Sequence, residues 1–172
     1  MRGYTRDEYF MHRAMLLAKE SAARGEIPVG AVIVRDGRII AEAGNGRERD
    51  KSALAHAELT AIGKACKVLG GWRLTGCELY VTLEPCTMCA GAIINARIPR
   101  VIFGTFDPKA GAMGGLFDVD AYPLNHHPEV VSGVLGEECA ELLRSFFRER
   151  RAGKGFDPAK NWREKNKKSF SE

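Results

Sequence analysis

The stretch that decides the fold is residues 78–95, which read ELYVTLEPCTMCAGAIIN. Its first six residues are mainly apolar, aromatic and β-branched, and they predict a strand. Pro85 then marks the start of a helix that we expect to run to about residue 96, with Cys86 and Cys89 in its opening turn. The stretch therefore predicts a strand that leads directly into a helix carrying two cysteines.

The residues before this unit predict two helices and a β-hairpin. Thr5 and Glu8 have the spacing of a capping box, and Asp36-Gly37 is a two-residue hairpin signal between two apolar runs. The expected elements are a helix from Thr5 to about Gly25, strands over 29–34 and 38–43, and a helix over 54–69.

The residues after the unit continue the alternation of strands and helices. We expect a strand over 100–104, a loop over 105–128 with at most a short helix near 109–116, a strand over 130–134 and a helix over 137–151. This order predicts the α/β class, as a three-layer α/β/α domain. Its central mixed sheet would have five strands, the first pair antiparallel and the later ones mostly parallel.

Length and composition indicate one globular domain. The chain has 172 residues, of which 45% are hydrophobic and 28% charged, values that exclude collagen-like, coiled-coil and disordered proteins. No apolar run approaches the length of a membrane helix and no secretory signal is present, so we expect a cytoplasmic protein with no membrane partner. Five cysteines in such a chain favour metal binding or catalysis over a disulfide framework.

The positive charge is concentrated at the carboxyl end. Residues 144–172 hold ten Lys and Arg against four acidic residues, whereas residues 1–143 hold 16 against 18. We divide the chain into a domain over 1–153 and a basic C-terminal tail over 154–172. Such a terminus either steers a polyanion or serves only to keep the protein in solution.

The candidate chemistry lies in His56, Glu58 and the two cysteines. Cysteines three residues apart at a helix start can bind Zn²⁺ as thiolates, and His56 can supply a third ligand. Three protein ligands leave a fourth tetrahedral position for water, which is the arrangement of catalytic zinc. Glu58, two residues after the histidine, could then act as general base and acid on that water.

Two other interpretations of these residues stay open at this point. Cys86 and Cys89 alone could be a redox pair, although the upstream His-x-Glu disfavours this. A structural zinc would need a fourth ligand, for which the candidates are Cys66, Cys77, Cys139, His12, His126 and His127.

The combination of His-x-Glu with Pro-Cys-x-x-Cys resembles the signature of the zinc-dependent cytidine/deoxycytidylate deaminase superfamily. The similarity extends from about Thr5 to Arg151 and is greatest with the bacterial tRNA adenosine deaminases. The resemblance implies a cytidine-deaminase-like fold, with one Zn²⁺ per subunit on His56, Cys86 and Cys89, and Glu58 as the catalytic proton carrier.

The resemblance also implies contacts with RNA. Asn45 matches a residue that hydrogen-bonds the target base, and Val29 one that packs against its face; a turn residue and a core valine are the alternatives. Further substrate contacts are implied at Asp107, Lys109, Asn125, His126, Phe147, Arg148 and Arg150. Asp107 and Lys109 could instead be solvated loop charges.

The function implied by the resemblance is hydrolytic deamination of the wobble adenosine, position 34, of an arginine tRNA to inosine. The expected partners are the tRNA anticodon stem-loop and a second copy of the chain, with the small apolar residues 90–94 as a contact surface or as core. One alternative is a deaminase of a free base or small nucleotide, such as guanine or cytosine, which the basic terminal helix disfavours. The other is a zinc-stabilised RNA-binding module, which would not need Glu58.

Overall fold

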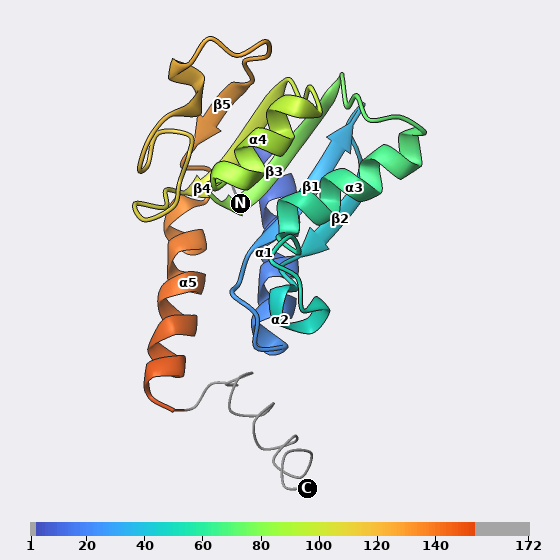
Figure 1. Ribbon diagram of the computed structural model, residues 1–172. Helices are drawn as coiled ribbons and strands as arrows, with labels where there is room; N and C mark the ends of the chain where they lie inside the picture. The colour runs from blue at the N-terminus through green and yellow to red at the C-terminus, as the bar shows by residue number, and fades with distance from the viewer. Residues whose placement is uncertain (1–2, 154–172) are drawn as a thin grey trace, which may run out of the picture.

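The computed structural model describes residues 3–153, in which helices cover both faces of a five-stranded sheet (Figure 1). The elements are α1 (Arg6–Ala23), β1 (Gly30–Arg35), β2 (Arg38–Gly44), α2 (Arg47–Asp50), α3 (Ala57–Leu69), β3 (Cys77–Leu83), α4 (Thr87–Asn95), β4 (Arg100–Thr105), the 3-10 helix η1 (Val119–Ala121), β5 (Glu129–Ser132) and α5 (Gly136–Arg151). The predicted three-layer α/β/α architecture is confirmed. The predicted tail, 154–172, lies outside the described residues.

The sheet is mixed, with the strand order β2-β1-β3-β4-β5. β1 is antiparallel to both β2 and β3, whereas β3, β4 and β5 are parallel to one another. Asp36 and Gly37 both have positive φ, 51° and 73°, as a two-residue turn of a right-twisted hairpin requires. The prediction of an antiparallel first pair followed by mostly parallel strands is therefore confirmed.

Each face of the sheet has its own hydrophobic core. Along β1, Ala31 and Ile33 pack in the cluster that includes α3 and α4, while Val32 and Val34 pack in the cluster that includes α1 and α5. This alternation follows from the two-residue period of a strand, and burial on both faces explains the uninterrupted apolar sequence. Among residues 3–153, no helix is both long and apolar enough to cross a membrane.

Two helices begin later than the sequence indicates. α3 begins at Ala57 and α4 at Thr87, so that His56 and Cys86 occupy the N-cap positions with extended backbone. The expected placement of Cys86 in the opening turn is thus wrong by one position. The cap residue has non-helical dihedral angles because it ends the preceding loop, which a propensity pattern does not reveal.

The segment 109–116, where at most a short helix is expected, forms turns without a helix, and a 3-10 helix lies further along at Val119–Ala121. The backbone N–H groups of Met113 and Gly115 donate to the carboxylate of Glu84. A helix would have used those donors for carbonyls one turn earlier in the chain. The carboxylate therefore replaces the helical hydrogen bonds.

Candidate active site

The three predicted metal ligands meet where α3 and α4 begin. The Nδ1 atom of His56 lies 3.7 Å from the Sγ atom of Cys86 and 3.5 Å from that of Cys89. All three ligand atoms lie within 4.8 Å of one another. The fold therefore brings together two sulfurs from one helix start and one imidazole nitrogen from another.

This donor set fits zinc, which binds thiolates and imidazole. The pKa of Cys86 is lowered to about 3, first by its hydrogen bond with Cys89 and then by that with His56, whereas the same hydrogen bond with Cys86 raises the pKa of Cys89. One of the two sulfurs is therefore readily available as a thiolate without a metal. No fourth His, Cys, Asp or Glu joins the group within residues 3–153. This arrangement favours an open catalytic site over a closed structural one.

Glu58 lies in the first turn of α3, beside the ligands but not among them. Its side chain is only 4% exposed, and burial raises its pKa to about 7. A carboxyl group in this environment can both accept and donate a proton. Glu58 also forms part of the wall of a pocket over the three ligands.

A pocket of about 190 Å³ opens over these residues. Its walls include Val29, Asn45, Arg47, Asp107 and Ala110, contributed by the segments around β1, β2 and the loop after β4. The volume is smaller than the roughly 300–1,000 Å³ of pockets for drug-sized ligands, and the pocket thus suits one planar base better than a whole nucleotide.

Asn45 is buried in this wall with one polar atom unpaired. Its Nδ2 atom donates to the carbonyl of Ile27 over a long distance of 3.4 Å, and its Oδ1 atom has no partner among the described residues. Val29 is 7% exposed; it lines the pocket and also packs in the core beneath α3, so both interpretations of this residue apply. An unpaired buried acceptor is costly unless a ligand completes it.

The loop after β4 contributes Asp107 to the pocket, whereas other predicted residues of this connection lie elsewhere. The Oδ1 atom of Asp107 accepts the backbone N–H groups of Lys109 and Ala110, which shapes the turn. The Nε2 atom of His126 donates to the carbonyl of Ile98 at 2.7 Å and so anchors the loop. Lys109 is exposed, as is Asn125, and neither they nor His126 line the pocket.

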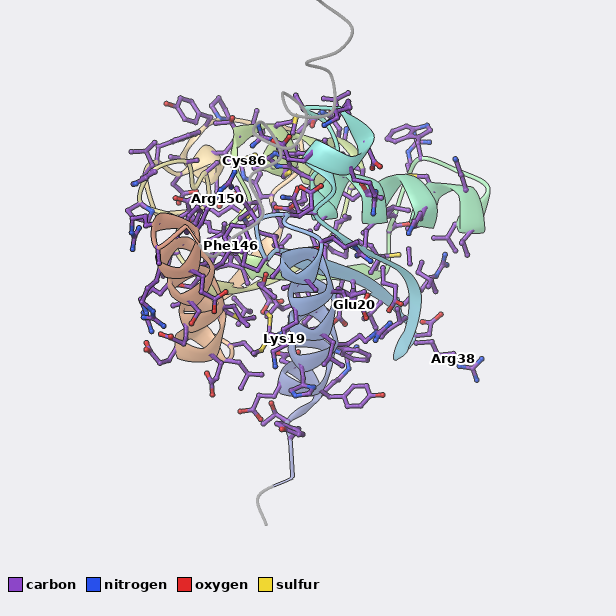
Figure 2. The ribbon with its side chains drawn as sticks, turned by 90° about the horizontal axis from the view of Figure 1, so that it is seen from below. Lys19, Glu20, Arg38, Cys86, Phe146 and Arg150 are labelled. Atoms are coloured by element: carbon purple, nitrogen blue, oxygen red, sulfur yellow. The ribbon has the colours of Figure 1, made fainter. Side chains whose placement is uncertain are left out.

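The carboxyl half of α5 extends past the end of the sheet, at the same end of the molecule as α2 (Figure 1). Phe147 is exposed there, Arg148 pairs with Glu141 at 3.1 Å, and the guanidinium of Arg150 lies over the ring of Phe146. Figure 2, the view from below, shows Phe146 and Arg150 on the flank of α5 that turns toward the centre of the molecule, the direction in which Cys86 also lies. The predicted RNA-binding residues of this helix thus form a group separate from the pocket.

Sequence reasoning missed two charged residues of the pocket lining, Arg47 and Glu84. Arg47 begins the four-residue α2, whose backbone N–H groups at residues 48 and 49 donate to the buried carboxylate of Glu26. Nothing local in the sequence indicates that contact. For Glu84 a signal exists, because an acidic residue directly follows a buried strand and precedes Pro85.

Comparisons with known proteins agree with this geometry. Residues 4–105 match the model of the cytidine and deoxycytidylate deaminase zinc-binding region. The tRNA-specific adenosine deaminase of Bacillus subtilis (strain 168) is 52% identical over 151 residues, which are 87% of this chain and 94% of the relative.

Two solved structures extend the comparison to the fold. One, from a study of A-to-I editing by tRNA:A34 deaminases at the wobble position of transfer RNA, has a TM-score of 0.75 and 47% identity and covers 78% of this chain and 99% of its own. A guanine deaminase from Nitrosomonas europaea has a TM-score of 0.70 and 26% identity, with coverage of 84% and 86%. The chain therefore belongs to the cytidine and deoxycytidylate deaminase zinc-binding family and, within it, to the tRNA-specific adenosine deaminases.

Proposed function

We propose that the protein converts the wobble adenosine, position 34, of an arginine tRNA to inosine. Water adds at C6 of the adenine, the bond from C6 to the exocyclic nitrogen breaks, and ammonia leaves. The observation that carries the proposal is a base-sized pocket with Glu58 and metal ligands in its walls and the unpaired Oδ1 atom of Asn45 beside them.

His56, Cys86 and Cys89 would hold zinc, and the bound metal would supply an activated water as the nucleophile at neutral pH. Glu58 takes a proton from the attacking water and delivers it to the departing nitrogen. Asn45 accepts a hydrogen bond from a donor on the base, and the side chain of Val29 packs against the base face. Burial of these groups keeps the base fixed while the proton moves.

The flanking nucleotides would be held outside the pocket. Asp107 and Lys109 lie on the loop at its rim, and Asn125 and His126 further along the same connection. The carboxyl half of α5 would meet the anticodon loop with the exposed ring of Phe147 for stacking and with two arginines, Arg148 and Arg150, for phosphates.

The proposal extends to assembly, location and chain organisation. We propose a cytoplasmic homodimer with one zinc in each subunit, in which residues 1–153 form the catalytic unit and residues 154–172 add positive charge. In the described structure, Ala90, Ile93 and Ile94 are buried within the subunit, whereas Gly91 and Ala92 are partly exposed. Within the 90–94 segment, only Gly91 and Ala92 are therefore available for a partner copy.

The experiment compares four substrates: the anticodon stem-loop of an arginine tRNA, adenosine, guanine and cytosine. Zinc-loaded protein should form inosine in the stem-loop, scored by reverse transcription, with one ammonia per inosine. Deamination of guanine or cytosine without deamination of the stem-loop would overturn the proposal in favour of a free-base deaminase. Stem-loop binding without ammonia from any substrate would favour an RNA-binding module.

A further inference from the structure

Glu84 is a buried carboxylate that makes its hydrogen bonds with one loop. Its side chain is 2% exposed at the end of β3, two residues before Cys86. One oxygen, Oε2, accepts the N–H of Asp107 at 2.8 Å, and Oε1 accepts those of Met113 and Gly115, each also at 2.8 Å. Within residues 3–153, no cation forms an ion pair with it, so peptide N–H groups compensate the buried charge.

The loop fits closely around this carboxylate. A Cβ atom at either Gly111 or Gly115 would lie 2.1 Å from the Oε2 atom of Glu84, so a side chain at either position would displace the carboxylate or the loop. The N–H of Ala112 also donates to the carbonyl of Pro85 at 2.9 Å. The loop is thus held against the chain segment that begins α4 and carries two of the metal ligands.

We infer that Glu84 is a positioning residue that fixes the substrate-contacting loop, residues 107–115, relative to the metal site. The loop supplies Asp107 and Ala110 to the pocket wall, and Glu84 links that wall to Cys86, from which it is separated by Pro85 alone. The inference rests on the proposed function, because this loop is the one expected to contact nucleotides beside the target base.

Position 84 requires a side chain that only accepts hydrogen bonds. Three N–H groups converge on the two carboxylate oxygens, and a carboxylate offers acceptor sites on both. Glutamine has nearly the same shape, but its NH₂ group would face at least one of these N–H donors. Glu84→Gln should therefore release one side of the loop while leaving the volume of the side chain nearly unchanged.

The test combines kinetics with hydrogen exchange on the full-length, zinc-loaded protein. In Glu84→Gln we expect KM for the anticodon stem-loop to rise about tenfold, the factor for ~1.4 kcal/mol and the lower end for a hydrogen bond to a charged group. The zinc content should be unchanged. Amide exchange at Asp107, Met113 or Gly115 should accelerate, while exchange in β3 should not.

A second variant, Gly115→Ala, should reproduce the effects of Glu84→Gln, because its Cβ would displace the carboxylate or the loop. Its matched control is Gly63→Ala, since a Cβ at this exposed helical position meets no atom within 4 Å. The control should keep the parent KM and exchange pattern. A Glu84→Gln protein with parental KM and parental exchange at residues 107–115 would overturn the inference.

Two further outcomes are decisive. If Glu84→Gln does not fold, hydrogen exchange in the parent protein decides. Exchange of the Met113 and Gly115 amides at the rate of an unstructured peptide would overturn the inference, and strong protection of these amides would support it. If the parent does not deaminate the stem-loop, the proposed function fails, and the exchange measurements alone still show whether Glu84 holds the loop.

Discussion

Replacement of Asn45 by alanine should separate activity from stability. The Oδ1 atom of Asn45 is buried without a partner among the described residues, and the bond of its Nδ2 atom to the carbonyl of Ile27 is long, at 3.4 Å. A buried polar atom without a hydrogen bond costs about 1–3 kcal/mol. Asn45→Ala removes this cost and only one weak bond, so the protein should be equally stable or more stable by up to ~2 kcal/mol.

The same substitution should impair the enzyme. A neutral hydrogen bond contributes roughly 0.5–1.5 kcal/mol, so loss of the contact with the base should lower kcat/KM roughly 2- to 13-fold. Thermal unfolding and steady-state deamination of the stem-loop, measured on the same preparation, check both expectations. For a chain of this size, each kcal/mol corresponds to a change of roughly 2–4 °C in Tm.

Ser21→Ala is the matched control. The Oγ atom of Ser21 is the other buried side-chain polar atom without a hydrogen-bond partner in the described residues, and it lies on α1, away from the pocket lining. Its replacement should also preserve or raise Tm, but it should leave kcat/KM unchanged. If Asn45→Ala instead lowered Tm by several degrees and kept full activity, Asn45 would be a structural turn residue and the reasoning would be refuted.

The remaining predictions concern proton transfer, phosphate binding and acid stability. Glu58→Gln should keep its zinc, measured by metal analysis, yet lose about 10²- to 10⁴-fold in kcat; near-parental turnover would contradict its role. Arg47 lines the pocket and has no ion-pair partner among residues 3–153, so Arg47→Gln should weaken stem-loop binding and reduce the salt dependence of binding by about one ion. The guanidinium of Arg49 already pairs with a neighbouring carboxylate, so Arg49→Gln should change stem-loop binding less. The hydrogen bond from Arg100 lowers the pKa of Asp7 in the folded protein. The carboxylate of Asp7 therefore contributes to stability above the pKa of about 3.9 that it has in the unfolded chain, and this contribution is lost as the pH falls through its lower pKa in the folded protein. Urea unfolding at several pH values below about 5 should therefore show a shallower acid loss in Asp7→Asn than in the parent.

The parts of the site that could be predicted from sequence are those whose chemistry is local. His56 and Glu58 are two residues apart, and Cys86 and Cys89 three apart, so each pair is placed by a single helix start whatever the rest of the fold does. The sheet was predictable for a similar reason, because the Asp36-Gly37 turn fixes the hairpin and apolar runs bounded by helices indicate buried strands.

The parts that could not be predicted depend on contacts between distant residues. The helix α2 has only four residues, too few to be stable alone, and it is held by Glu26, 22 positions before Glu48. The loop after β4 takes its shape from Glu84, which lies 23 to 31 positions before the donors that it binds. In both segments a buried carboxylate overrides the local secondary-structure propensity. The backbone N–H groups that it binds lie far away in the sequence and can be identified only from the folded structure.

The N-cap positions of α3 and α4 have a consequence for how the enzyme is made. His56 and Cys86 occupy these positions, and neither side chain makes a capping hydrogen bond. Ser, Thr, Asp or Asn at such a position would contribute typically ~1 kcal/mol to a helix. The chain thus gives up two conventional helix starts to obtain metal ligands, and binding of zinc joins both starts at one point. Bound zinc should consequently stabilise both helix starts together, in addition to supplying the chemistry of the site.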